Sequence, residues 1–379
     1  MNILYHHRTK SRDGQAVHIR ELIAALRRGG HHVEEWALSK GDDGEMGSEG
    51  GVLGKLMARL PRVTYELAEH AYGPLVSGKL AEAGRACGAD VLYERHALSN
   101  TAGLRASKAL GIPLLLEVNS PLATERSEHE TLVLQGWASR SEQNVFQGAD
   151  RLLVVTRVLA DMLVAQGLPS DRIRVIPNGA DLSLYPLDPP RESDEVVVGF
   201  TGFFRPWHGI EGLVDGLADG LLPAGSRLLL VGTGPAQESI EARAQERGVA
   251  DRVRITGAVG REEIPDLVRS MDICVQPAAT AWASPLKLFE YMAAGKAVVA
   301  VDQPNLREVL TDERDALLFP AGDHAALCQA VARLAGDRPL RQALGAGARE
   351  TLETRGYTWD KNAERVVDIA EECLGRVLA

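Results

Sequence analysis

A lysine and a glutamate lie three residues apart in a stretch that has its own helix start and stop signals. The stretch begins with Ser284 and Pro285, which suit the N-cap and first helical positions, and Gly295 suits the left-handed position after a helix. The first turn would offer unpaired amides and partial positive charge, to which Lys287 adds a full charge. Glu290 shares that helix face and could accept hydrogen bonds from hydroxyls. Phosphate and hydroxyl chemistry side by side indicate a sugar nucleotide, and an ordinary capped surface helix is the alternative.

Three further glycine-containing turns follow predicted strands in the second half of the chain. The turn 199–209 carries Arg205, a planar donor suited to phosphate oxygens, and His208, which could donate to the same group. The alternative makes Arg205 a solvated loop cation and His208 a cap. The turns at Gly234 and Val259 can bring backbone close to a ligand. Because the carboxyl ends of parallel strands share one sheet edge, we expect these turns to converge there with the helix that carries Lys287.

A similar junction lies near the start of the chain. Gly14 and Gln15 follow the first predicted strand, and the glycine would allow backbone to approach a phosphate. His18 lies in the helix that follows. The full three-glycine dinucleotide fingerprint is missing, so the sequence does not predict a nicotinamide cofactor.

The elements that position these residues form a regular alternation of short apolar runs and longer amphipathic segments. Such alternation predicts parallel sheets covered by helices, and about twelve strands suit two doubly wound domains better than one sheet. Proline-rich and polar residues from 184 to 194 predict the linker. The predicted strands are Ile3–Tyr5, Val33–Leu38, Val91–Tyr93, Leu114–Val118, Leu152–Val155, Ile173–Ile176, Val196–Thr201, Leu228–Val231, Val253–Thr256, Ile273–Gln276, Ala297–Val301 and Leu317–Phe319.

Composition narrows the class of protein. The 379 residues are 45% hydrophobic and 25% charged, with a net charge of -10, which predicts a globular chain that does not bind nucleic acid. There is no apolar run of about 18 residues and no signal-peptide pattern at the first residues. The four scattered cysteines favour reduced thiols in a cytoplasmic protein over disulfides or a metal site, and Cys274 is predicted to lie in the core.

Two segments leave alternatives open. The acidic, glycine-rich stretch 41–51 is either a tolerated surface insertion, which we favour, or a loop that folds over a ligand. The basic amphipathic stretch 52–85 could touch an anionic membrane surface, but its glutamates favour helices that cover the core. At most, we expect peripheral contact with the inner face of a membrane.

These motifs resemble the family-4 retaining glycosyltransferases of the GT-B fold over essentially the whole chain. The residues that carry the resemblance are Gly14 with 18–22, the run 175–181, Arg205–Gly209, 231–235 and 284–301. The resemblance implies an α/β protein with two Rossmann-like domains across a cleft. Residues 1–186 with 358–379 would bind the acceptor and 187–357 the nucleotide sugar. The final helix would cross back to the first domain.

The resemblance also implies roles for single residues on the donor side. Arg205 and Lys287 would contact the diphosphate, with amides at Ser284, Pro285 and Leu286, and Glu290 would bind the ribose. Gly14, Gln15, His208, Gly234 and Val259 would complete the donor site. His208 stands where the family has a lysine, and Trp282 stands where it has the first of two glutamates. The opening Ser-Pro-Leu-Lys-Leu-Phe-Glu-Tyr would then mark a subgroup that lacks this glutamate.

On the acceptor side, Asn119 replaces the family's histidine near the reacting sugar. His18, Glu94, Arg95 and Glu125 would line the acceptor site, where carboxylates could suit an amine, and ordinary surface charge is the alternative. The acceptor would be a glycan, a lipid-linked sugar or a small aminocyclitol.

The implied reaction is retaining transfer of a hexose-type sugar with no metal and no cofactor, because protein cations neutralise the leaving diphosphate. Three alternatives remain on the same fold: a pseudo-glycosyltransferase, a nucleotide-sugar epimerase and a catalytically silent sugar-nucleotide-binding partner. The base and the sugar are not predicted.

Overall fold

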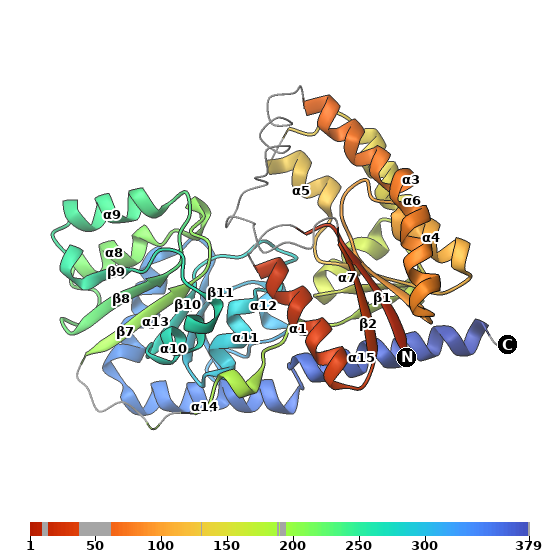
Figure 1. Cartoon of the computed structure of the whole chain (residues 1–379). Helices are drawn as coiled ribbons and strands as arrows, with labels where there is room; N and C mark the ends of the chain where they lie inside the picture. Colours follow the sequence, from red (N-terminus) through yellow and green to blue (C-terminus); the bar gives the residue numbers. More distant parts are fainter. Residues whose placement is uncertain (10–13, 38–61, 130, 188, 190–194, 378–379) are drawn as a thin grey trace. The chain divides into compact units, whose positions relative to one another are not determined.

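The computed structural model describes residues 1–9, 14–37, 62–129, 131–187, 189 and 195–377 (Figure 1). The chain divides into two compact units, Met1–Pro177 with Asp360–Ala379, and Asn178–Trp359. The division falls before the proline-rich linker predicted at 184–194, most of which lies outside the described residues. The predicted loop at 41–51 also lies outside them, as do residues 52–61 of the basic stretch.

The first unit is built on a six-stranded parallel sheet with the order β2-β1-β3-β4-β5-β6. Helices cover this sheet, and its central strands β1, β3, β4 and β5 are almost fully buried, whereas the edge strand β2 is partly exposed and carries Glu34 and Glu35. The strands are β1 (Asn2–His7), β2 (His32–Ala37), β3 (Val91–Arg95), β4 (Leu114–Val118), β5 (Arg151–Val154) and β6 (Ile173–Val175). The helices are α1 (Gly14–Arg28), α3 (Arg62–Cys87), α4 (Ala102–Leu110), α5 (Leu122–His129), α6 (Gln135–Gly148), α7 (Arg157–Ala165) and α15 (Trp359–Val377).

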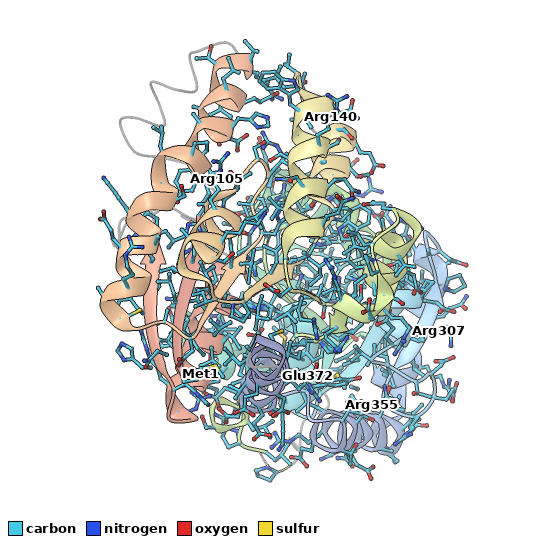
Figure 2. All side chains as sticks on the ribbon, turned by 90° about the vertical axis from the view of Figure 1, so that its right-hand side faces the viewer. Met1, Arg105, Arg140, Arg307, Arg355 and Glu372 are labelled. Carbon is cyan, nitrogen blue, oxygen red and sulfur yellow. The ribbon has the colours of Figure 1, made fainter. Side chains whose placement is uncertain are left out.

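Although α15 follows the second unit in sequence, nearly all of it belongs to the first unit. Its apolar side chains, including Val366, Ile369 and Cys373, are buried. Asn362 Nδ2 donates to the carbonyl of Pro177 at 2.7 Å. Glu372, labelled in Figure 2, pairs with Arg174 on β6 at 3.3 Å. Apolar burial therefore holds the helix in place, with polar contacts at its margins.

The second unit repeats the design with the strand order β12-β11-β10-β7-β8-β9, again all parallel. The strands are β7 (Val196–Thr201), β8 (Ser226–Val231), β9 (Val253–Ile255), β10 (Ile273–Gln276), β11 (Ala297–Asp302) and β12 (Leu317–Pro320). The helices are α8 (Glu211–Ala218), α9 (Gln237–Glu246), α10 (Ile264–Arg269), α11 (Leu286–Ala293), α12 (Pro304–Arg307), α13 (His324–Gly336) and α14 (Arg338–Thr354). All twelve predicted strands are thus confirmed.

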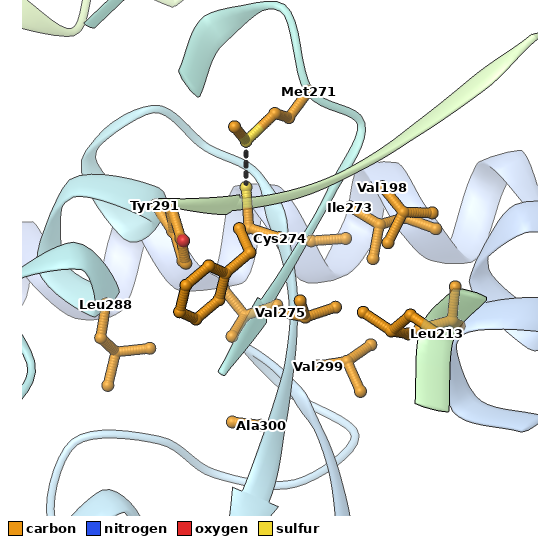
Figure 3. Close-up of a cluster of buried hydrophobic side chains, with 14 of the residues drawn as sticks. Val198, Leu213, Met271, Ile273, Cys274, Val275, Leu288, Tyr291, Val299 and Ala300 are labelled. Atoms are coloured by element: carbon orange, nitrogen blue, oxygen red, sulfur yellow. Dashed lines mark hydrogen bonds between the residues drawn. The ribbon is translucent and has the colours of Figure 1, made fainter. Parts of the chain in front are cut away.

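The core of the second unit lies along its central strands (Figure 3). Val198, Val275 and Val299, from three neighbouring strands, are each no more than 1% exposed. Cys274 is buried with its sulfur 3.6 Å from the sulfur of Met271, which confirms the predicted core cysteine. This core fixes the strand ends from which the functional loops leave.

Among the helices in the described part of the chain, none has the length and apolar character needed to cross a membrane.

Candidate functional site

The turns that follow β7 and β8 pack directly on one another. Gly202 N donates to the carbonyl of Val231 at 2.8 Å, and Phe204 N donates to the carbonyl of Thr233 at 2.8 Å. A Cβ on Gly232 would lie 2.0 Å from the Gly202 carbonyl oxygen, and one on Gly234 would lie 2.4 Å from Phe204 N. Glycine is therefore required where the two loops touch. Gly232 also pairs with Gly257, which brings the turn before Val259 alongside.

Helix α11 starts differently from the prediction. It begins at Leu286, and Pro285 occupies the N-cap with no side-chain capping bond. Ser284 faces another segment, because its Oγ accepts from Asn178 N at 3.3 Å and its carbonyl accepts from Asn178 Nδ2 at 2.6 Å. The prediction that Ser284 caps the helix is wrong. Within the described residues no side chain caps the first-turn amides, which suits an anionic ligand.

The other end of α11 agrees with the sequence. Gly295 follows the helix with φ of +61°, as predicted for a left-handed terminating glycine. Tyr291 is fully buried and its hydroxyl accepts from the backbone N–H of Thr201 at 2.8 Å. This bond ties the middle of the helix to the carboxyl end of β7, so the helix and the glycine loops form one rigid edge.

Lys287 points its ammonium into this edge. Its Nζ lies 3.8 Å from the centre of the Phe200 ring, a cation–π contact. A Cβ on Gly202 would lie 3.0 Å from the same nitrogen, so the absence of a side chain there makes room for it. Within the described residues the ammonium has no hydrogen bond or ion pair. Burial lowers the pKa of Lys287 to about 7, although the nearby Glu290 carboxylate opposes this. An arriving anion would restore the full charge.

Arg205 and His208 lie on the same loop but are placed very differently. Arg205 is exposed, with its guanidinium 4.8 Å from the centre of the Phe203 ring. His208 is buried, and its Nδ1 accepts from the backbone N–H of Arg205 at 3.2 Å. Burial, Lys287 and Arg205 lower the pKa of His208 to about 3. The imidazole is therefore neutral with its proton on Nε2. His208 caps this turn and adds no positive charge, and donation from its Nε2–H to a ligand stays a prediction.

Apart from Gly14 and Gln15, the remaining predicted donor-site residues lie on the same unit. Glu290 is half-buried on α11 and hydrogen-bonds with Tyr185, whose pKa is raised by burial and by this carboxylate. Leu286 opens the helix, and Val259 is half-buried against the core. Trp282 is half-buried in the segment before α11.

In the first unit, three predicted residues meet at a carboxylate that we did not single out from the sequence. Glu117, on β4, is 2% exposed. His18 Nε2 lies 3.2 Å from its Oε2, Asn119 Nδ2 donates to Oε1 at 2.5 Å, and Arg95 Nη1 also bonds to Oε1. Burial alone would raise the pKa of Glu117, but His18 and Arg95 hold it well below its usual range. The sequence feature that could have revealed Glu117 is an acidic residue inside the otherwise apolar strand 114–118.

The other first-unit residues take separate positions. Glu94 is fully buried, bonded to His6 Nδ1 and to the backbone N–H of Gly103 at 2.9 Å, so it is not the rim carboxylate that we expected. Glu125 is half-buried in the first turn of α5. Gly14 and Gln15 are exposed at the start of α1, where an incoming group could reach them.

Comparison with known proteins identifies the family. The family model "Glycosyltransferase Family 4" matches residues 12–184, and "Glycosyl transferases group 1" matches residues 195–337. A D-inositol 3-phosphate glycosyltransferase of Xylanimonas cellulosilytica is 28% identical over 78% of this chain and 75% of its own. A phosphatidyl-myo-inositol mannosyltransferase of Mycobacterium leprae is 31% identical over 60% of this chain and 63% of its own.

Solved structures show the same fold. Sucrose-phosphate synthase from Thermosynechococcus elongatus has a TM-score of 0.74 at 20% identity, covering 99% of this chain and 100% of that one. Anabaena HepE in complex with UDP-glucose has a TM-score of 0.72 at 18% identity, covering 98% and 100%.

The two doubly wound units have the GT-B fold. The two family models match separate parts that together span most of the sequence. The chain belongs to the group 1, family 4 glycosyltransferases.

Proposed function

We propose that this protein transfers a hexose-type sugar, with retention of configuration, from a nucleotide diphosphate sugar to an acceptor hydroxyl. The observation that carries the proposal is the unneutralised ammonium of Lys287, held over Phe200 beside Gly202 at the start of α11. Among the described residues, the ammonium makes a cation–π contact with Phe200 but no hydrogen bond or ion pair. A diphosphate at this edge would receive charge from Lys287 and hydrogen bonds from the first-turn amides, with exposed Arg205 within reach.

The proposed chemistry needs stabilisation of the leaving group more than a protein base. The bond between the sugar's anomeric carbon and the phosphate oxygen breaks, and the acceptor oxygen bonds to that carbon from the same face. The acceptor proton passes to the departing phosphate oxygen. Lys287 and Arg205 would neutralise the charge that develops on the diphosphate, in place of a metal ion. Glu290 would accept hydrogen bonds from the ribose hydroxyls, with Tyr185 holding its carboxylate.

The substrates are proposed from the relatives and neighbours. HepE structures hold UDP and UDP-glucose, and the curated relatives are named for inositol phosphate and phosphatidylinositol acceptors. We infer a nucleotide-sugar donor bound by Asn178–Trp359 and a polyol, glycan or lipid-linked acceptor bound by the first unit.

Product analysis tests this proposal. The protein is incubated with UDP-, GDP-, ADP- and dTDP-sugars labelled with ¹³C at the anomeric carbon, with myo-inositol and simple glycosides as acceptors. A new α-linked product from an α-linked donor supports retaining transfer. An epimerised sugar would identify a nucleotide-sugar epimerase. Transfer that occurs only when a nucleotide-activated non-sugar cyclitol replaces the nucleotide sugar would identify a pseudo-glycosyltransferase. Binding of the donor with neither transfer nor hydrolysis would point to a silent partner, the alternative that Trp282 and Asn119 motivate.

A further inference from the structure

The carboxylate of Glu117 is surrounded by hydrogen-bond donors. Besides His18, Arg95 and Asn119, Tyr93 donates to Oε2 at 2.7 Å and Tyr5 at 3.4 Å. Burial and the Glu117 charge raise the pKa of both phenols, so they keep their protons. An ionised carboxylate can only accept hydrogen bonds. Every polar neighbour must therefore turn a donor toward it.

This requirement fixes the orientation of the Asn119 amide. Its NH₂ group points at Glu117, since the opposite orientation would set two oxygens against each other at 2.5 Å. Asn119 is half-buried immediately after β4. Among the described residues its Oδ1 has no hydrogen-bond partner. The amide thus presents an acceptor away from the cluster, at the edge where ligands of open α/β sheets bind.

We propose that Glu117 is a positioning residue that turns Asn119 Oδ1 toward the ligand, so that this edge takes a ligand group that donates a hydrogen bond. A hydroxyl of a sugar or cyclitol fits, whereas a phosphate or carboxylate oxygen would be repelled. The ligand class in this inference rests on the proposed function. The orientation of the Asn119 amide does not depend on it. A histidine, the residue that the family resemblance implies here, could donate or accept, whereas this asparagine is locked as an acceptor.

The orientation can be measured without any substrate. In protein labelled with ¹⁵N-asparagine, the side-chain NH₂ of Asn119 should exchange with solvent at least about tenfold more slowly than that of Asn144, which is exposed on α6. The Asn119→Ala spectrum identifies the resonance. Glu117→Gln should remove most of this protection, because a glutamine can also donate and lets the amide rotate. Glu142→Gln, which alters another buried glutamate bonded to His96, should leave Asn119 unchanged. Equal exchange of Asn119 and Asn144 in the wild-type protein would overturn the proposal, even if Glu117→Gln fails to fold.

Kinetics test the consequence for the ligand. Asn119→Leu keeps the side-chain size but removes the outward oxygen. We expect kcat/KM for transfer to fall by about tenfold or more, while the Kd for UDP, bound by the other unit, stays within about twofold. Unchanged kcat/KM would contradict the ligand role. If no nucleotide sugar is turned over at all, the proposed function fails, and the exchange measurement still decides whether Glu117 orients Asn119.

Discussion

At the scale of single residues, the ammonium of Lys287 is the feature with the clearest chemical consequence. Burial lowers its pKa to about 7, and binding of an anionic diphosphate would favour the protonated form. We therefore expect affinity for a nucleoside diphosphate to fall as pH rises above about 7, because the free protein increasingly lacks the charge. Calorimetry at pH 8 in buffers of different ionisation enthalpy should show proton uptake on binding, using the tightest of UDP, GDP and ADP. Equal uptake by Lys287→Met would contradict this assignment.

The two cations of the proposed donor site should both affect turnover. Lys287→Ala and Arg205→Ala each remove positive charge from the leaving diphosphate, so we expect kcat to fall by about tenfold or more, a barrier increase of about 1.4 kcal/mol. The matched control is Arg227→Ala, which removes an exposed arginine of the same unit that pairs with Glu195. Turnover of either site variant within about twofold of the wild type would reject that residue's role.

At the scale of elements, a glycine in the β7 turn makes room for Lys287 of α11. Gly202 has φ of +125°, and an added Cβ would lie 3.0 Å from Lys287 Nζ. Gly202→Ala should therefore displace the ammonium and weaken nucleotide binding as well as lowering stability by about 1–3 kcal/mol. Gly220→Ala provides the control, because Gly220 has φ of +71° with no atom within 4 Å of the added carbon. Both variants should have a lower Tm, and only Gly202→Ala should bind the nucleotide more weakly. Normal nucleotide affinity in Gly202→Ala would show that Gly202 is not needed to make room for Lys287.

The segment that leads into α11 is held by the buried side-chain amide of Asn305. Asn305 Nδ2 donates to the carbonyls of Thr280 at 3.1 Å and Ala283 at 2.7 Å, and Asn305 is 1% exposed. Asn305→Ala would leave both carbonyls without this donor, at a cost of about 1–3 kcal/mol. Hydrogen exchange should then accelerate locally at residues 280–285. Asn144→Ala, on the exposed face of α6, should have no such effect, and unchanged exchange at 280–285 in Asn305→Ala would show that other contacts order the segment.

At the scale of the whole molecule, the fold could be predicted from the sequence. Parallel strands that are buried on both faces have short apolar sequences, which can be recognised locally. The strands that begin at Leu114 and Ala297 can be predicted from their own residues, without knowledge of the strands beside them. Gly295 was also predictable, since a terminating glycine acts within its own turn.

The site was less predictable where partners lie far apart in sequence. Ser284 bonds to Asn178 across 106 residues, so a local capping rule could not place it. Glu94 pairs with His6 across 88 residues, which buries a carboxylate that looked like surface charge. Glu117 gathers donors from β1, β3, α1 and the residue after β4, and only its position within an apolar strand hinted at that role.

The most direct test of the central claim is the affinity of the protein for UDP, GDP and ADP, measured by calorimetry on the wild type and two variants. We expect at least one nucleotide to bind, Lys287→Met to raise its Kd about tenfold or more, equivalent to about 1.4 kcal/mol, and Glu290→Gln also to weaken binding. Glu142→Gln, in the first unit, should bind as the wild type does. Failure of all three nucleotides to bind, or equal affinity in the wild type and both site variants, would contradict a nucleotide-sugar site at the edge formed by β7, β8 and α11.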